Sequence, residues 1–152
     1  MERLFEAEQR LPYPVERVFS FFAEAENLER ITPPELRFGI VTPLPLVLRA
    51  ETTIDYRLRL FGIPFRWRSV ITEWDPPRAF TDEQVKGPYA LWIHRHTFEP
   101  DRGGTVIRDR VRYKLPLGAL GDLAHPLVRR QLLRIFDYRR RAVDTAFPGG
   151  AP

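Results

Sequence analysis

In two neighbouring stretches, residues 91–99 and 105–115, mostly apolar or aromatic side chains alternate with mostly charged ones. This alternation constrains the fold more than any other feature. A two-residue period is that of a strand with one buried face. The link between the stretches, Asp101-Arg102-Gly103-Gly104, has the composition of a tight turn. The pattern therefore predicts a β-hairpin in which even positions of the first strand lie beside odd positions of the second on one face.

The predicted shared face of this hairpin is mostly apolar but holds several polar groups. Its members are Trp92, His94, His96, Phe98, Ile107, Asp109, Val111, Tyr113 and Leu115. A buried polar group destabilises a protein unless it finds a partner, so a face used only for packing would rarely carry two imidazoles, a carboxylate and a phenol. We therefore take this face as the candidate functional surface.

The rest of the chain is typical of further strands followed by one long helix. Strands are predicted over 4–11, 36–41, 51–60, 65–74 and 79–86, and short helices over 15–22 and 24–31. After Pro116 the period becomes helical, which predicts a helix over 120–147 with a kink or restart near Pro126. The predicted fold class is α+β: a curved antiparallel sheet of seven strands that grips a long C-terminal helix, with two short helices after the first strand, in a single domain over 1–152.

The predicted long helix has an apolar face and an arginine-rich remainder. The apolar positions at helical spacing are Leu120, Ala124, Leu127, Leu132, Ile135, Tyr138, Ala142 and Ala146. The helix arginines, Arg139 among them, are interleaved with Asp137 and Asp144, as on a solvated helix face. No aromatic side chains alternate with these arginines to stack on bases, so nucleic acid is not an expected partner.

Composition excludes several classes of function. The chain has no cysteine, which rules out disulfides and thiolate chemistry and makes a cytoplasmic location the expectation. No apolar run reaches the ~18 residues of a membrane span, so stable membrane insertion is not expected. The net charge of +4 is too small to argue for a polyanionic partner. The sequence leaves the oligomeric state open.

Several segments resemble the START-like or SRPBCC superfamily, whose helix-grip fold has the same order of elements, and in particular its bacterial single-domain members. The resembling segments are Pro14–Phe19, Asn27–Pro34, Asp82–Gln84, Gly87–Tyr89, and Trp92-x-His94-x-His96-x-Phe98 followed by Thr105 and Asp109. The resemblance covers nearly the whole chain and implies a cavity between sheet and helix, reached past the loops at one end. Superfamily members include lipid carriers, hormone receptors and polyketide aromatase/cyclases, so the fold alone does not fix an activity. The metal and iron–sulfur motifs of its oxygenase subunits have no match here, and neither a metal nor a cofactor is expected.

The polar groups of the candidate surface have three interpretations. In the first, His94 or His96 pairs with Asp109 and the cluster only satisfies itself. In the second, these groups orient a ligand in a mostly apolar pocket. In the third, two histidines and a carboxylate hold a metal, which the crowding of neighbouring aromatics disfavours. For function we favour the second, the binding of a hydrophobic or aromatic small molecule, or a lipid, by a carrier or sensor.

This interpretation gives a specific set of site residues. The predicted ligand-binding residues are Tyr56, Trp67, Trp92, His94, His96, Phe98, Asp109, Val111, Tyr113, Ile135 and Tyr138. Apolar turn tips predict a lid over the cavity mouth, formed by the loop residues Phe61, Gly62, Ile63, Gly87, Pro88 and Tyr89. The alternative function is enzymatic, a polyketide cyclase-like acid–base reaction by one of the histidines with Asp109 as its orienting carboxylate.

Overall fold

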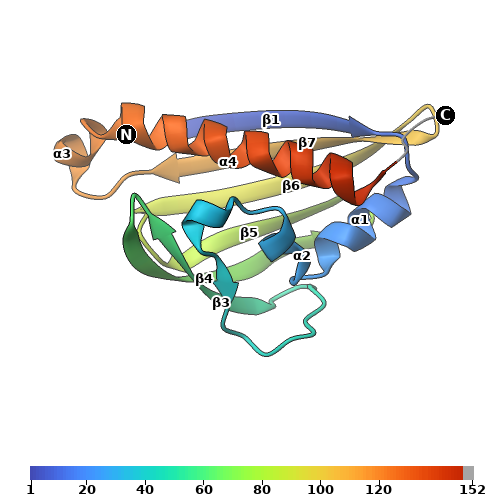
Figure 1. Cartoon of the computed structure of the whole chain (residues 1–152), viewed down its shortest axis with the longest axis horizontal. Coiled ribbons are helices and arrows are strands. Elements are labelled where there is room, and N and C mark those ends of the chain that lie inside the picture. The colour runs from blue at the N-terminus through green and yellow to red at the C-terminus, as the bar shows by residue number, and fades with distance from the viewer. Residues whose placement is uncertain (149–152) are drawn as a thin grey trace.

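The computed structural model describes residues 1–148, and within them it has seven strands, four α-helices and one 3₁₀ helix (Figure 1). In chain order the elements are β1 (Arg3–Leu11), α1 (Val15–Ala23), α2 (Asn27–Arg30), the 3₁₀ helix η1 (Pro34–Leu36), β2 (Gly39–Ile40), β3 (Thr53–Leu60), β4 (Ile63–Asp75), β5 (Ala79–Lys86), β6 (Leu91–Asp101), β7 (Gly104–Lys114), α3 (Gly118–Asp122) and α4 (His125–Ala146). Residues 149–152, the end of the predicted domain, lie outside the described residues.

The seven strands form one antiparallel sheet in the order β1-β7-β6-β5-β4-β3-β2. Strands β2 to β7 therefore pair in the order of the chain, and β1 joins the sheet at the edge of β7. The predicted hairpin is confirmed, and His96 lies opposite Asp109 on its shared face. Its turn is closed by Arg102 and Gly103, with φ angles of 50° and 77°, as a two-residue hairpin turn of this twist requires.

The long C-terminal helix is divided in two. α3 ends at Asp122 and α4 begins at His125, so the predicted restart near Pro126 is confirmed. Pro126 lies in the first turn of α4, where its missing N–H breaks no helical hydrogen bond. α4 runs along one face of the curved sheet, while α3 extends past the end of the strands (Figure 1). No helix among the described residues has the length and apolarity that crossing a bilayer requires.

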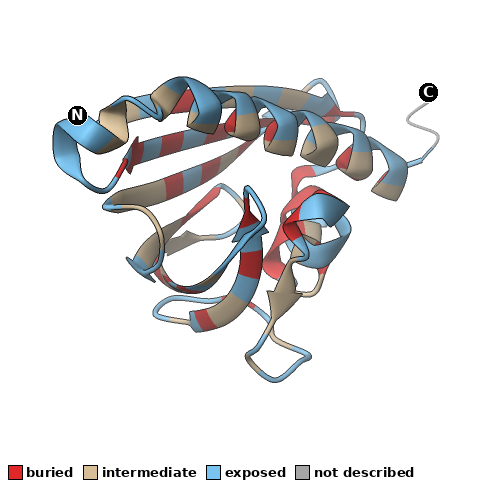
Figure 2. Cartoon of the chain, turned by 60° about the vertical axis from the view of Figure 1, so that its left-hand side comes forward, coloured by how far each residue is buried: buried red, intermediate tan, exposed pale blue. Residues whose placement is uncertain are grey.

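The buried face of α4 differs from the predicted one. Leu132, Phe136 and Val143 are buried, whereas Leu120 and Leu127 are 68% and 56% exposed. Four other residues of the predicted apolar face are only half-buried: Ile135, Tyr138, Ala142 and Ala146. The prediction extended one face back to Leu120, but α3 extends past the end of the strands and none of its residues is buried. Figure 2 shows most of α3 and the outer side of α4 in the pale blue of exposed residues.

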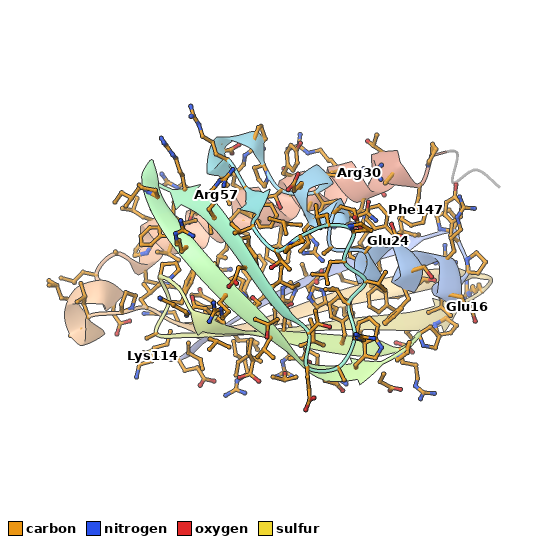
Figure 3. The ribbon with its side chains drawn as sticks, turned by 90° about the horizontal axis from the view of Figure 1, so that it is seen from below. Glu16, Glu24, Arg30, Arg57, Lys114 and Phe147 are labelled. Atoms are coloured by element: carbon orange, nitrogen blue, oxygen red, sulfur yellow. The ribbon has the colours of Figure 1, made fainter. Side chains whose placement is uncertain are left out.

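The end of the molecule that holds the C-terminus of α4 is closed by α1 and by packed aromatic rings. Centroid distances of 5.2–6.0 Å separate the contacting ring pairs among Phe19, Phe22, Phe80 and Phe98. Phe147, at the end of α4, packs on Phe21 at 5.2 Å. Figure 3 shows Phe147 and Glu16 of α1 at one end of the molecule and Lys114, the last residue of β7, at the other. This solid core confines any open space to the middle and the opposite end of the sheet.

The strand predicted over 36–41 forms only in part. Residues Pro34–Leu36 make η1, and Arg37 then adopts a left-handed φ of 46°. A left-handed residue turns the chain away from an extended path, so pairing begins only at Gly39 and the strand is two residues long.

Most arginines of the outer sheet face are paired and exposed. Arg95 contacts Glu73 at 2.9 Å and Arg112 contacts Glu2 at 2.9 Å. Ion pairs of this exposure each stabilise a fold by no more than ~1 kcal/mol. These exposed pairs therefore contribute little to the stability of the sheet.

Candidate functional site

A cavity of about 150 Å³ lies between the inner face of the sheet and α4. The predicted site residues that line it are Tyr56, Trp67, Tyr89, Trp92, His94, His96 and Ile135. The sequence did not single out the remaining apolar walls, which include Phe22, Leu28, Leu36, Phe38, Leu58, Leu60, Leu132 and Phe136. The cavity thus draws its walls from the strands β3 to β6, from α4, and from α1 and the segments that connect it to β3.

Five predicted ligand-binding residues do not line the cavity: Asp109, which lies behind the histidines, and four residues that belong to other parts of the structure. Phe98 belongs to the aromatic core, and Val111 and Tyr113 are fully buried in a separate cluster with Leu132. Tyr138 lies on another side of α4, where the guanidinium of Arg134 is 5.4 Å from the centroid of the Tyr138 ring. Strand alternation assigns a side chain to a face, but α1 and α4 fill both ends of that face and leave only its middle open. The set of residues that lines this cavity is therefore smaller than the predicted ligand-binding set.

The predicted lid residues divide into outward and inward groups. Phe61 and Ile63 are 59% and 57% exposed at the β3–β4 turn, and Gly62 and Gly87 are also exposed. Pro88 is half-buried, and Tyr89 alone among the six lines the cavity. These placements leave the lid a proposal, with Tyr89 as its inward member.

The β5–β6 link that carries Tyr89 is fixed by one side chain. The amide of Gln84 donates to the carbonyl oxygen of Tyr89 at 2.7 Å and accepts from its N–H at 3.0 Å. A Cβ on Gly87 would lie 2.5 Å from Oε1 of Gln84, so a side chain at this position would displace the amide that holds the turn. The β5–β6 link is therefore a turn whose conformation is fixed by two hydrogen bonds from one side chain.

Aromatic rings form one wall of the cavity. The ring of Trp67 lies 5.4 Å from that of Trp92 and 5.7 Å from that of Tyr89, and Tyr89 lies 4.8 Å from Trp92. Tyr56 stacks on Trp67 at 5.8 Å. Such a wall favours contact with flat apolar ligands.

Ser69 satisfies the polar atoms of this wall. The indole N–H of Trp67 donates to its Oγ at 2.9 Å, and the hydroxyl of Tyr56 lies 3.2 Å from the same oxygen. Burial and the nearby charge of Asp82 raise the pKa of Tyr56, so its phenol stays protonated. These contacts make Ser69 a structural hydrogen-bond partner of the wall.

The polar part of the cavity holds two histidines, each paired with a carboxylate. Nε2 of His94 is 2.8 Å from Oδ1 of Asp109, and Nε2 of His96 is 2.8 Å from Oδ2 of Asp82. The two imidazoles stack with their centroids 3.7 Å apart, and Nδ1 of His96 lies 3.2 Å from Oδ1 of Asp109. His94 thus makes the shorter contact with Asp109, a pairing that the sequence left open. Asp109 lies behind the histidines and does not line the cavity.

Arg139 of α4 completes this cluster. Its side chain is 12% exposed, and Nη2 lies 3.6 Å from Oδ1 of Asp109 and 3.3 Å from Nδ1 of His96. The sequence interpretation placed Arg139 on the solvated face of the helix, and this was wrong. Arg139 follows Phe136 by three residues and precedes Val143 by four, so it lies on the buried stripe of α4. That spacing was the signal that could have found it.

The charges of the cluster favour one extra proton. Two carboxylates and one guanidinium leave one net negative charge when both imidazoles are neutral, and protonating one imidazole balances it. Burial alone would lower the pKa of His96, but hydrogen bonds to Asp109 and Asp82 outweigh burial and raise it. Burial, together with the neighbouring His96, lowers the pKa of His94. When the cluster holds one extra proton, that proton resides on His96, and His94 is neutral.

Both carboxylates of the cluster remain ionised. Burial opposes this, but the charge of Arg139 and the hydrogen bonds from His94 and His96 hold the pKa of Asp109 well below its ordinary value. Burial likewise opposes ionisation of Asp82, and the hydrogen bond from His96 holds its pKa below the ordinary value. Nδ1 of a charged His96 donates to Asp109, so it does not accept from Arg139. The guanidinium of Arg139 then interacts with the carboxylate of Asp109 as an ion pair.

Asp82, His94 and His96 also place one possible metal-ligand atom each within 4.8 Å of one another. Two of these atoms, Nε2 of His96 and Oδ2 of Asp82, already bond each other at 2.8 Å. The guanidinium of Arg139 adds a positive charge beside them, which would repel a divalent cation. We therefore assign no metal to this group.

A curved antiparallel sheet closed over a C-terminal helix, with a cavity between them, defines the class of helix-grip proteins. Within this class, residues 11–137 match the family described as polyketide cyclase / dehydrase and lipid transport, and the chain belongs to that family. No curated protein matches the sequence.

Solved structures of similar fold support this class. TTHA0849 from Thermus thermophilus is 22% identical with a TM-score of 0.69, over 96% of this chain and 100% of that one. A START superfamily protein from Mycobacterium smegmatis is 11% identical with a TM-score of 0.71, over 95% and 96% of the two chains. The di-domain ARO/CYC StfQ from the steffimycin biosynthetic pathway is 20% identical with a TM-score of 0.73, and the match spans 96% of this chain and 50% of StfQ. At these identities the likeness establishes the fold alone.

Proposed function

We propose that this protein binds a hydrophobic or aromatic small molecule, or a lipid, in the cavity between the sheet and α4, as a carrier or sensor. The observation that carries the proposal is the cavity itself, which has aromatic and aliphatic walls and a small polar region. Ligand sites commonly combine mostly apolar walls with a few convergent polar groups. The family description, which includes lipid transport, is consistent with this function.

The size of the cavity bounds what it holds in this conformation. Its volume is about 150 Å³. An engineered apolar cavity of ~150 Å³ in another protein binds benzene, whereas sites for larger ligands span roughly 300–1,000 Å³. A single aromatic ring therefore fits directly. A lipid chain or a fused-ring compound requires α4 or the β5–β6 link to move.

Calorimetry and thermal unfolding with small aromatic probes test the proposal. Toluene at a hundredfold excess over its Kd should stabilise the fold by about 2.7 kcal/mol. Ile135→Trp should abolish this stabilisation by filling the cavity, because Ile135 is part of its lining. Leu133→Trp is the matched control, since Leu133 is a half-exposed neighbour on the same helix outside the cavity lining. Absence of stabilisation by toluene, naphthalene and a fatty acid alike, or equal binding by Ile135→Trp and the wild type, would refute the proposal.

One observation favours a second candidate, an acid–base enzyme. His94 is neutral, is oriented through Nε2 by Asp109 at 2.8 Å, and lines the cavity. A histidine oriented in this way can act as a general base. In a polyketide cyclase-like reaction, Nδ1 of His94 would take the proton from a carbon next to a carbonyl. The enolate formed would attack a second carbonyl carbon, whose C=O π bond opens to an alkoxide that takes the proton back from His94.

Hydrogen exchange at carbon tests the first step of that reaction. Acetophenone in D₂O should lose the NMR signal of its methyl protons faster with the protein than without it. His94→Ala should remove the acceleration and leave binding of the probe intact. If the probe is bound but its protons exchange at the uncatalysed rate, the enzymatic alternative is refuted and only the binding function remains.

A further inference from the structure

Two hydrogen-bond acceptors face each other in the polar part of the cavity without a donor between them. Nδ1 of His94 and Oδ2 of Asp82 are 4.0 Å apart, too far for a direct hydrogen bond. Nε2 of His94 bonds to the carboxylate of Asp109 at 2.8 Å, so the single proton of the neutral ring lies on Nε2. Nδ1 is then an acceptor, and it makes no hydrogen bond to any of residues 1–148. An ionised Asp82 has only acceptor atoms.

The residues that carry the two acceptors both line the cavity, His94 buried and Asp82 half-buried. The side chain of His94 is 6% exposed and that of Asp82 is 19% exposed. A buried acceptor that lacks a donor destabilises the fold because it has lost its hydrogen bonds to bulk water. In the part of the chain that the structure describes, Nδ1 of His94 lacks such a donor, and Oδ2 of Asp82, which accepts from Nε2 of His96, can accept a second hydrogen bond. A ligand group with O–H or N–H hydrogens, placed between them, would supply a donor to either atom.

Neighbouring groups hold the two acceptors in place. Asp109 fixes the ring of His94 from one side, and the imidazole of His96 stacks on it at 3.7 Å. His96 also bonds Oδ2 of Asp82 at 2.8 Å. The gap is therefore preorganised, and a ligand that fits it need not reorder the side chains first.

We infer that the ligand of this cavity is an aromatic molecule whose polar end donates hydrogen bonds, such as a phenol, a catechol or an arylamine, with that end directed at Asp82 and His94. This inference rests on the proposed function and narrows its ligand class. The same geometry disfavours a carboxylate ligand, because a second anion would lie against Asp82. The nearest cation of α4, Arg139, is already engaged by Asp109.

Five single-ring probes of similar size test the inference by calorimetry at pH 7.5: toluene, anisole, phenol, catechol and benzoate. Phenol should bind roughly tenfold or more tightly than anisole, because a hydrogen bond to a charged acceptor is stronger than an average one. Catechol, with two donors, should bind at least as tightly as phenol. Benzoate should not bind at the same concentrations.

Two variants locate the preference within the site. Asp82→Asn should bring the phenol-to-anisole affinity ratio close to one, since the charged acceptor is gone. Glu83→Gln makes the same chemical change at the next residue of β5, whose side chain points to the other face, and should leave the ratio unchanged. If Asp82→Asn does not fold, the wild-type probe series still decides the matter.

Each contrary outcome has a distinct meaning. Equal affinities for anisole and phenol would overturn the inference while leaving the proposed function intact. Preferred binding of benzoate, or displacement of phenol by Zn²⁺, would also overturn it and assign the polar group to an anion or a metal. If none of the five probes bound, toluene included, the proposed function itself would fail and the inference with it.

Discussion

Asp109→Asn removes the charge at the centre of the buried cluster without changing the size of the side chain. The Asp109 carboxylate lies 2.8 Å from Nε2 of His94, 3.2 Å from Nδ1 of His96 and 3.6 Å from the guanidinium of Arg139. The amide can still accept a hydrogen bond from His94, so the principal loss is the attraction between the carboxylate and the positive charges. Arg139 is left buried without its ionic partner.

The expected loss of stability follows from this geometry. Two unit charges about 4 Å apart interact by ~4 kcal/mol at an effective dielectric constant of ~20, and the easier burial of a neutral amide offsets part of that. Breaking one side of a buried pair typically costs about 3–5 kcal/mol, and we expect the lower end, about 3 kcal/mol, because the amide keeps one hydrogen bond. For a chain of this length, that is a fall in Tm of roughly 6–12 °C.

Denaturant unfolding and calorimetry at several pH values provide the assay. The pKa of Asp109 is lowered on folding, so its contribution is present above the unfolded value of ~3.9 and is lost as the pH falls through the folded value. The difference between wild type and Asp109→Asn should therefore be full at pH 5 and shrink at pH 3 and below. Asp75→Asn is the control: Asp75 pairs with Arg78 at 2.9 Å and is 47% exposed, so its loss should be less than ~1 kcal/mol. Equal losses in the two variants would refute the buried charge network.

The remaining predictions concern the histidines and the β5–β6 link. By NMR, His96 should titrate above the ordinary ~6.5 and His94 below it, and Asp109→Asn should lower both values; unchanged curves would disprove the pairing. The pKa of His96 is raised on folding, so His96 stabilises the protein fully below pH ~6.5, and this stabilisation is lost as the pH rises through the folded value. The free energy of unfolding of wild type and His96→Gln should therefore differ less as the pH rises, and a constant difference from pH 6 to 9 would contradict this. Gln84→Ala should speed amide hydrogen exchange at Tyr89 by freeing the link, with no effect at β1, and a saturating probe should slow it again in the wild type.

The fold was largely predictable because its strongest signals are local. The alternation of residues 91–115 placed His94, His96 and Asp109 on one face, and the pairing of β6 with β7 confirms it. Strand period and turn composition depend on neighbours in the chain, so a single sequence displays them. The strand over 36–41 was predicted too long because the left-handed Arg37 carries no such signal in its residue type.

The candidate site was predicted only in part because it depends on how helices sit on the sheet. Trp92 and Phe98 share one strand face, yet only Trp92 lines the cavity, since α1 packs over the other end. Asp82 was not among the predicted site residues, because its hydrogen bond to His96 depends on the register of β5 against β6. Arg139 was missed because the helix phase was counted from Leu120, beyond the sheet, where no buried partner sets it.

Arg139 couples the position of α4 to the number of protons that the cluster holds. It is the positive group that α4 contributes, while the carboxylates and the imidazoles it faces belong to β5, β6 and β7. A displacement of α4 that widens the cavity also carries the guanidinium away from Asp109, and the remaining groups then bind protons more tightly. Thermodynamic linkage makes the relation reciprocal. Mild acid favours the displaced helix, and any ligand that holds α4 apart from the sheet draws protons from solution.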